Sequence, residues 1–340
     1  MSIQNDPQLR GRRSCANPLQ SGLVTSPCHS NPTQHRASSA LASALALSCL
    51  LVALPGTALA GAWTQPQGDT LVIVKALHSD GTGWFDDAHH RGDFGNNGRS
   101  RQDQLNVYLE HGVTDNLTAI GNFYFTEVGF NNDEPVDGVP GRARRSTTGF
   151  ADQEIGLRYA LPSASDDVWR SSVQALVSIP AYGRSKTYHP NNPSPDPALG
   201  LGDYGLELRY SRGRGYTLGN HNGYVDLGGA VRLRGSAASD EVRVDASTGL
   251  SLAPSWLLLG EINLIQGLGN GRSDAFISGE SPADSGYVAT GTTYDLTKLQ
   301  LSTLYTAPGG SQWQVGYQQP VMGRNTGAAG GPFVAAWWHF

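Results

Sequence analysis

Apolar and polar residues alternate with a period of two along most of the chain after residue 60, and this pattern limits what the chain can fold into. Leu105, Val107 and Leu109 alternate with polar neighbours, and segments 172–179 and 242–247 repeat the pattern. A period of two places successive side chains on opposite faces of a β-strand, with one face apolar. The pattern therefore predicts an all-β protein whose strands have one apolar and one polar face.

The expected strands are long. Soluble strands usually run to about 5–6 residues, whereas a tilted strand that crosses a membrane needs about 9–11. We therefore expect a transmembrane antiparallel up-and-down β-barrel of twelve strands, at 69–78, 103–113, 116–128, 149–161, 168–181, 199–211, 222–234, 240–252, 255–267, 290–306, 312–321 and 332–340. A turn at Tyr294–Lys298 would give thirteen strands. That count is odd, against the rule for bacterial barrels.

The expected connections alternate between short and long, with one exception near 235–239. Short turns are expected at 114–116, 163–167, 212–215, 253–255 and 308–310, and long loops at 79–102, 129–148, 182–198, 268–289 and 322–331. Short turns on one rim and long loops on the other are typical of outer-membrane barrels. Aromatic residues flank most of the short turns, as expected of an interfacial girdle: Tyr159, Trp169, Tyr210, Tyr216, Trp256, Tyr305 and Trp313.

The first sixty residues have the features of a tail followed by a secretory signal peptide. Residues 40–54 read ALASALALSCLLVAL, and the small residues of an A-x-A site end at Ala60. We expect cleavage near Ala60, which divides the chain into 1–60 and a barrel domain at 61–340. A membrane-spanning helix is the alternative, but the apolar run is short for one. A lipoprotein signal is disfavoured because more apolar residues follow Cys49.

The charge and the cysteine content exclude or disfavour several classes of function. The chain has 24 Lys+Arg, 29 Asp+Glu and three cysteines, and residues 1–60 hold four of the arginines, one aspartate and every cysteine. The remainder has 20 basic and 28 acidic side chains and no thiol. Nucleic-acid binding is disfavoured because it needs a basic surface. Thiolate metal sites are excluded from the mature chain, and we expect no cofactor.

Short motifs carry a resemblance to known proteins. They are AWTQP at 62–66, YLEHGVTD at 108–115, GRNTG at 323–327 and the terminal Phe340. With these motifs the region after residue 60 resembles Gram-negative outer-membrane β-barrels, and among them an uncharacterised group of transporters akin to the meta-pathway phenol-degradation barrels. The resemblance implies transport of small, often apolar or aromatic molecules, and no catalytic residues. It also implies insertion by the outer-membrane barrel assembly machinery, through Phe340.

Strand alternation predicts which charged side chains face the lumen. Besides the residues named below, the basic inward set includes Lys75, and the acidic inward set includes Asp152, Asp203 and Glu241. Candidate ion pairs are Glu154 with Arg158, Glu207 with Arg209, and Arg243 with Asp245. Such pairs would either fill a narrow lumen or line a hydrated, mildly acidic pore. The predicted pore-lining residues are Glu110, Glu154, Arg158, Glu207, Arg209, Asp226, Arg232, Arg243, Asp245 and Glu261.

Two loops carry weaker signals. Loop 79–102 contains Trp84, Asp86, Asp87, His89, His90, Asp93 and Phe94. Carboxylates and imidazoles can bind a divalent cation. These residues, however, do not show the spacing of metal ligands on a helix or strand, so we predict no metal site. The proline-rich segment 186–197 forms either a stiff loop or a constriction over the mouth.

Enzymatic activity is a weaker alternative. A lipid-facing hydrolase would need a serine and a histidine close together, with an asparagine to orient the histidine. The nearest local sequence, His221-Asn222-Gly223, lacks the serine. Asp86, Asp87 and the two following histidines resemble the aspartate-histidine active site at the rim of outer-membrane proteases. Those proteases are ten-stranded barrels, whereas we expect twelve strands here.

We therefore expect an outer-membrane channel for passive passage of small neutral, cationic or aromatic solutes. Its surroundings would be membrane lipid and lipopolysaccharide. A structural or adhesive barrel with a plugged lumen is the alternative, followed by an outer-membrane hydrolase.

Overall fold

The computed structural model describes residues 61–134, 140–163, 167–183, 196–235, 238–271 and 292–340. Within these residues, every regular element is a β-strand. Among the same residues, no helix is long and apolar enough to cross a membrane.

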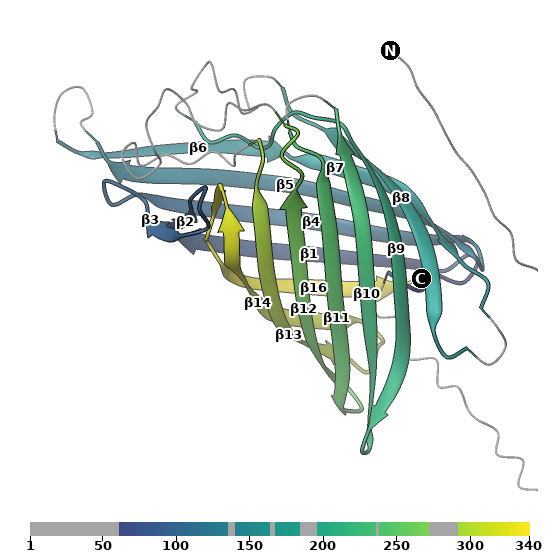
Figure 1. Ribbon diagram of the computed structural model, residues 1–340. Helices are drawn as coiled ribbons and strands as arrows, with labels where there is room; N and C mark the ends of the chain where they lie inside the picture. The colour runs from purple at the N-terminus through teal and green to yellow at the C-terminus, as the bar shows by residue number, and fades with distance from the viewer. Residues whose placement is uncertain (1–60, 135–139, 164–166, 184–195, 236–237, 272–291) are drawn as a thin grey trace, which may run out of the picture. The chain divides into compact units, whose positions relative to one another are not determined.

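The strands form one closed antiparallel barrel (Figure 1). Strands β6 and β7 both pair with β5 and share one position in the ring, so the barrel has the twelve positions that the alternation predicts. In ring order the strands are β1 (Thr70–Gly81), β4 (Arg99–Thr114), β5 (Leu117–Asp133), β6 (Arg142–Phe150) with β7 (Asp152–Ala160), β8 (Arg170–Pro180), β9 (Gly205–Leu218), β10 (His221–Arg234), β11 (Glu241–Ala253), β12 (Trp256–Gly267), β13 (Asp295–Thr306), β14 (Gln312–Arg324) and β16 (Gly331–His339).

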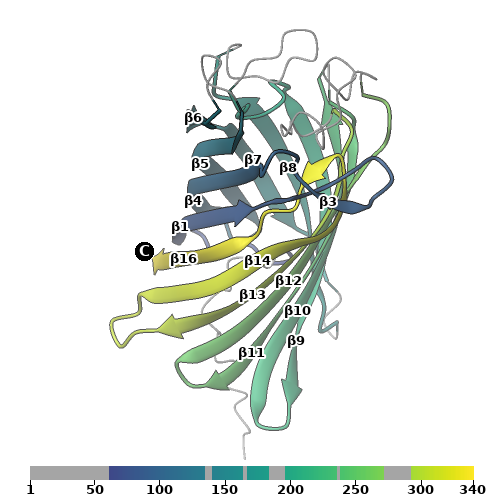
Figure 2. The ribbon, with the colours of Figure 1, turned by 90° about the vertical axis from the view of Figure 1, so that its left-hand side faces the viewer.

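The first and last strands close the ring, and Figure 2 shows β16 between β1 and β14. Their register runs from Leu71 opposite His339 to Leu77 opposite Phe333. Two backbone hydrogen bonds between Thr70 and Phe340 extend the seam, with N···O distances of 3.0 and 2.9 Å. Closure leaves no unpaired strand edge in lipid, where an unpaired backbone group would be costly.

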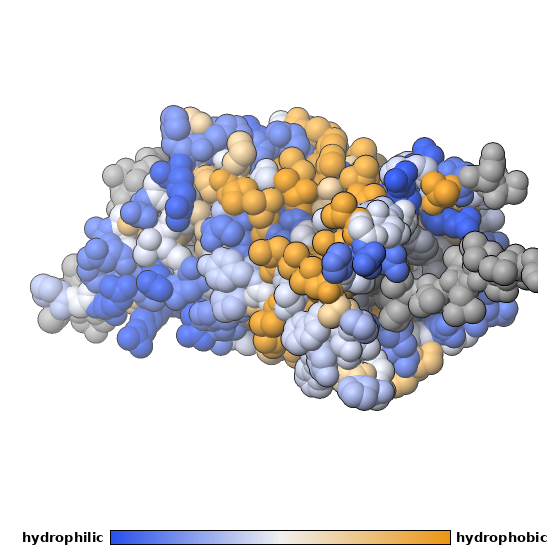
Figure 3. All heavy atoms as spheres, turned by 90° about the horizontal axis from the view of Figure 1, so that it is seen from below, coloured by the Kyte–Doolittle hydropathy of each residue, from blue (hydrophilic) through white to orange (hydrophobic). Residues whose placement is uncertain are grey.

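The two faces of the sheet have opposite chemistry. One outward row crosses five neighbouring strands as Leu157, Ala175, Leu208, Val231 and Val242. Figure 3 shows a hydrophobic band across the middle of one face, with hydrophilic residues on both sides of it. An apolar outer band around a polar interior is the arrangement of outer-membrane barrels.

Aromatic side chains lie at the rim of the short turns. Trp256, Tyr305 and Trp313 form one outward row on β12, β13 and β14, and the Trp256 and Tyr305 rings are 4.9 Å apart. Tyr159 and Tyr210 belong to a second row, on β7 and β9. These rows are the geometry of an interfacial girdle.

The expected turn at 212–215 is wrong, because β9 continues to Leu218. The hairpin turns instead at Gly219, whose φ of +59° suits glycine. Arg212 and Arg214 point outward beyond the apolar band, and both guanidinium groups lie over the Trp169 ring, at 5.2 and 5.3 Å from its centroid. The run of arginine and glycine resembles a turn in sequence, but here it extends a hairpin past the girdle.

Other strand boundaries also differ from expectation, and β9 begins at Gly205 rather than at residue 199. The long loop predicted at 129–148 is shorter, because β5 runs to Asp133 and β6 begins at Arg142, and these two residues form an ion pair at 3.0 Å. Strand β13 begins at Asp295, so the segment 294–298 is not a turn, which confirms the count of twelve strands over the alternative of thirteen.

The expected strand at 149–161 is interrupted at Ala151, between β6 and β7. The side-chain amide of Gln153 replaces the missing ladder contacts: its Oε1 accepts the Tyr124 N–H at 3.0 Å and its Nε2 donates to the Tyr124 carbonyl at 2.9 Å. The two pieces therefore act as one wall strand with an irregularity, as β-bulges do near functional regions.

A second small sheet lies at the end of the barrel opposite the short turns. It consists of β2 (Gly83–Phe85), β3 (Arg91–Asp93) and β15 (Thr326–Gly327). Trp84, Phe94 and Phe130 form a buried cluster beneath it. The segment 79–102, which the sequence predicted to be a long loop, therefore contains the strands β2 and β3. Of the proline-rich segment 186–197, all but Asp196 and Pro197 lies outside the described residues.

The apolar band can be tested on β9. Leu208 lies midway along the outward apolar run, whereas Leu218 lies beyond Arg212 and Arg214. We expect Leu208→Arg to lower the free energy of unfolding by about 2–4 kcal/mol, because a charge near the bilayer midplane is costly. Leu218→Arg should cost about 0–1 kcal/mol. Guanidinium unfolding in lipid vesicles, followed by tryptophan fluorescence, measures both; equal costs would contradict the position of the band.

Candidate functional site

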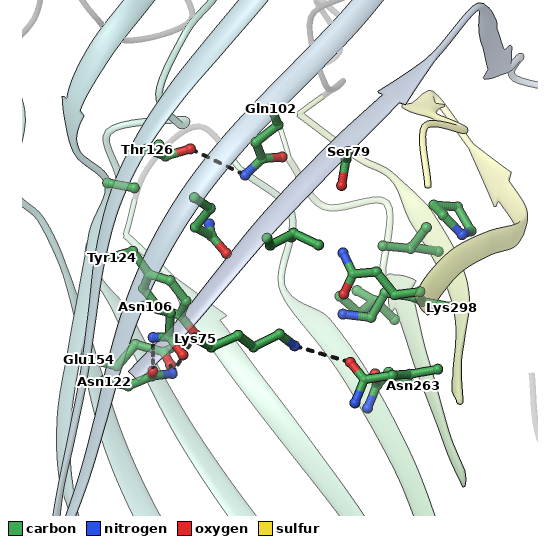
Figure 4. Close-up of a pocket in the computed structure, with 18 of the residues that line it drawn as sticks. Lys75, Ser79, Gln102, Asn106, Asn122, Tyr124, Thr126, Glu154, Asn263 and Lys298 are labelled. Carbon is green, nitrogen blue, oxygen red and sulfur yellow. Dashed lines mark hydrogen bonds between the residues drawn. The ribbon is translucent and has the colours of Figure 1, made fainter. Parts of the chain in front are cut away.

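A cavity of about 830 Å³ occupies the inside of the barrel. Its lining extends from Gly61, Asp226 and Trp337 at the short-turn end to Phe94 and Phe130 at the other end. Figure 4 shows Asn106, Asn122, Tyr124 and Glu154 on one wall, and Lys75 and Lys298 reaching into the same space. Polar and apolar side chains both contribute to the lining, and side-chain amides supply much of its polar part: Gln102, Gln104, Asn106, Asn122, Asn263, Gln300, Gln314 and Gln318.

A network of buried ion pairs covers one side of the cavity. Arg232 of β10 donates to Glu154 of β7 at 2.5 Å and to Glu207 of β9 at 2.8 Å. Glu207 also accepts Arg209 Nε at 3.0 Å. The side chains of Arg232 and Glu207 are 6% and 2% exposed, so this pair is almost fully removed from solvent. Mutual pairing between strands compensates the cost of burying these charges.

The network continues toward the long-loop end on β10 and β11. Glu241 accepts Arg243 Nη2 at 2.5 Å and Arg234 Nη2 at 2.6 Å. Asp245 accepts Arg209 and the Asn263 amide, the latter at 2.9 Å. Most carboxylates of this wall are therefore already bound by arginine.

Nine of the ten residues predicted from the sequence to line a pore lie on the cavity wall, and Glu110 lies below it. Of the predicted ion pairs, Glu207 with Arg209 is correct and the other two are wrong. Arg158 binds Glu110 at 2.7 Å, Glu154 binds Arg232, and Arg243 binds Glu241. The error arises because long arginine side chains reach partners on other strands, which spacing along one strand cannot show. Asp152 and Asp203 bind loop groups outside the cavity, Tyr182 Oη and Ala238 N.

The opposite wall carries two lysines. Lys75 Nζ donates to Gln300 Oε1 at 3.1 Å and lies 4.1 Å from the centre of the Phe333 ring. Gln300 in turn donates to Glu261 at 2.6 Å. Lys298 lies nearby on β13, and no described residue forms an ion pair or hydrogen bond with its ammonium group. Lys298 is not among the residues predicted from the sequence to face inward, although it lies two positions from the inward Gln300 on the same strand.

Residues 61–68 enter the barrel at its short-turn end and lie against the inner wall. Gln65 N donates to Thr118 Oγ1 at 2.8 Å, and Gln65 Nε2 donates to Glu110 Oε2 at 2.6 Å. Arg158 donates to the Trp63 carbonyl at 3.0 Å. The segment therefore takes part in the same polar network as the barrel wall, and we call it the N-terminal segment.

Two glycines make room for the N-terminal segment. A Cβ on Gly112 would lie 1.9 Å from the Pro66 carbonyl oxygen, and a Cβ on Gly213 would lie 2.4 Å from the Trp63 ring. A larger residue at Gly112 would displace the backbone of the segment, and one at Gly213 would displace the Trp63 ring. The sequence motifs at 62–66 and 108–115 are thus the two sides of one contact.

An apolar cluster fills the rest of the short-turn end. Leu71, Leu259, Leu304, Tyr224 and Trp337 are buried together inside the barrel. The Trp63 ring joins them, edge to face with Tyr224 at 6.3 Å. The N-terminal segment and this cluster together form the floor of the cavity.

The loop residues considered for metal binding or catalysis have structural contacts. Asp86 accepts the backbone N–H groups of Ala88 and His90, at 2.9 and 2.7 Å. His89 Nδ1 lies 3.0 Å from the Gly323 carbonyl, and His221 Nδ1 lies 2.7 Å from the Ser251 carbonyl. Among the described residues, no group of three or more His, Cys, Asp or Glu side chains could hold a metal ion.

Comparisons with known proteins agree with the barrel. No family model and no curated protein matches the chain. The crystal structure of an outer-membrane channel from Pseudomonas putida F1 is similar over 82% of this chain and 97% of that chain, with a TM-score of 0.58 and 13% sequence identity. At this identity the likeness concerns the fold.

Two other solved structures are more distant. The NanC porin is similar over 78% of this chain and 98% of that chain, with a TM-score of 0.40 and 10% identity. The translocator domain of the autotransporter NalP from Neisseria meningitidis is similar over 81% of this chain and 90% of that chain, with a TM-score of 0.40 and 11% identity.

The buried network can be tested by removing one arginine. We expect Arg232→Gln to lower the free energy of unfolding by about 3–5 kcal/mol, because it leaves Glu154 and Glu207 without their common counter-ion. Arg212→Gln is the matched control: its ion pair with Asp167, at 3.6 Å, is exposed and should contribute less than about 1 kcal/mol. Denaturant unfolding compares the two, and a similar loss in both variants would contradict the buried network.

Proposed function

We propose that the protein is an outer-membrane channel for the passive passage of small solutes. One observation carries the proposal: a closed barrel with an apolar outer band encloses a polar cavity of about 830 Å³. A polar interior is what a hydrated path through a membrane requires. The fold that the chain shares with the Pseudomonas putida F1 channel adds support.

Small, uncharged polar solutes suit this interior best. The sequence predicted neutral, cationic or aromatic solutes and disfavoured anions, because acidic side chains outnumber basic ones on the expected inner face. Arginines neutralise most of those carboxylates, and Lys298 adds a positive charge to the wall. Side-chain amides can donate and accept hydrogen bonds with hydroxyl and amide groups of a solute. Passage of aromatic solutes is also expected, but only from the resemblance of the sequence to the transporter group.

Charge selectivity would depend on the lysine wall. In single-channel recordings under a KCl gradient, we expect Lys298→Gln to shift the permeability ratio toward cations. Glu261→Gln, on the same wall, should shift it toward anions. Each shift should reach up to about fivefold, since one unit charge at 4 Å in water contributes about 1 kcal/mol. Conductance that neither substitution alters would contradict passage through this cavity, and silence in a folded barrel would contradict a channel.

The N-terminal segment would set the width of the path. Gly112→Ala must displace the segment, because the added Cβ cannot fit against Pro66. Such overpacking costs about 1–3 kcal/mol, so we expect a larger and noisier single-channel conductance. Gly229→Ala is the control, because nothing lies within 4 Å of a Cβ added there. Equal conductance in both variants would mean that the segment does not restrict passage.

A structural barrel with a plugged lumen is the second candidate. The packed floor, with Trp337 1% exposed and Leu259 1% exposed, favours it. The single-channel recordings above distinguish the two functions. A plugged barrel would show no conductance after Gly112→Ala, although it would still migrate as a folded barrel in gel electrophoresis without heating.

The membrane surroundings form part of the same proposal. The wall outside the apolar band carries Arg99, Arg101 and Arg142, which suit the phosphate groups of lipopolysaccharide. Phe340 ends the closing strand and is 75% exposed, so the barrel assembly machinery could recognise it. The expected leader at 1–60 would direct the chain across the inner membrane.

A further inference from the structure

Asp226 is a buried carboxylate whose hydrogen-bond donors are both backbone groups of the N-terminal segment. The residue is 6% exposed. Its Oδ1 lies 3.2 Å from Gly61 N and its Oδ2 lies 2.9 Å from Ala62 N. Among the described residues, no Lys, Arg or His forms an ion pair with it. The other carboxylates of the buried network each have an arginine.

The nearest arginines are occupied elsewhere. Arg158 binds Glu110, Gln174 and the Trp63 carbonyl. Arg209 binds Glu207 and Asp245. A buried charge without a counter-ion is strongly unfavourable, so this position needs a cation that the side chains do not provide.

We propose that Gly61 is the first residue of the mature protein and that its α-ammonium group is the counter-ion of Asp226. In the uncleaved chain the nitrogen of Gly61 is an amide. A leader peptidase would add water across the Ala60–Gly61 peptide bond, which leaves a carboxylate on Ala60 and an amine on Gly61. An α-amino group is largely protonated at pH 7. The charge would then lie 3.2 Å from the carboxylate oxygen, which is within hydrogen-bond distance.

Local geometry agrees with a chain that starts at this residue. A Cβ on residue 61 would lie 2.6 Å from Ser211 Oγ, so the position accepts glycine. Ser172 Oγ donates to the Gly61 carbonyl. Independently, Ala58 and Ala60 form the A-x-A site that the leader of this sequence presents. Cleavage would therefore create the group that anchors the N-terminal segment, and this inference does not depend on whether solutes pass.

Amine labelling tests the pair directly. We would purify the full-length gene product from outer membranes in detergent, identify its first residue by mass spectrometry, and label it with an N-hydroxysuccinimide ester. Gly61 should be the first residue, and its amine should react slowly. In Asp226→Asn the labelling should be about tenfold faster, which corresponds to about 1.4 kcal/mol. Glu261→Gln, a lumen carboxylate without contact to the segment, should label as the wild type does.

A second comparison covers the case in which Asp226→Asn does not fold. Chains that begin at Gly61 or at Ala60 would be refolded from tag-free material, since one added residue moves the charge by up to about 3.8 Å. The Ala60 form should label about tenfold faster. A mature chain that starts at another residue overturns the proposal, as do equal labelling rates in either comparison. Neither readout uses conductance, so failure here is distinct from failure of the channel proposal.

Discussion

Backbone pairing at the seam between β1 and β16 is the constraint on which the rest of the structure depends. Leu71 to Leu77 pair with Phe333 to His339, and the bonds between Thr70 and Phe340 continue the seam. Without it, both strands would present unpaired N–H and C=O groups to lipid. Once the ring is closed, each strand has one face toward lipid and one toward a shared interior. The alternation of apolar and polar residues along each strand then gives the barrel an apolar exterior and a polar interior.

The interior is organised by how its charges are neutralised. On the wall of β7, β9, β10 and β11, arginines pair with carboxylates of other strands. Arg232 of β10 binds both Glu154 of β7 and Glu207 of β9. The charges of this wall nearly cancel. The opposite wall holds Lys75 and Lys298 among amides, so it presents most of the charge that a solute would meet. The contrast makes one wall a scaffold and the other the surface that would decide selectivity.

The N-terminal segment links these walls to the floor of the cavity. It takes hydrogen bonds from Arg158, donates to Glu110 and Thr118, and ends at Asp226. Gly112 and Gly213 leave it the space that it occupies. The same few residues therefore connect the barrel wall, the floor of the cavity and the proposed first residue of the mature chain.

The sequence by itself determined the all-β barrel, its twelve strands and most of the inward charges, because a period of two assigns every residue to one face. It also placed the aromatic rim. Only the tertiary structure decided that β9 extends to Leu218, that Arg158 binds Glu110, and that residues 61–68 lie inside the barrel. The reason is physical. Alternation is local and fixes which face a side chain is on, whereas ion-pair partners depend on strand register, side-chain reach and the space left by a glycine on another strand.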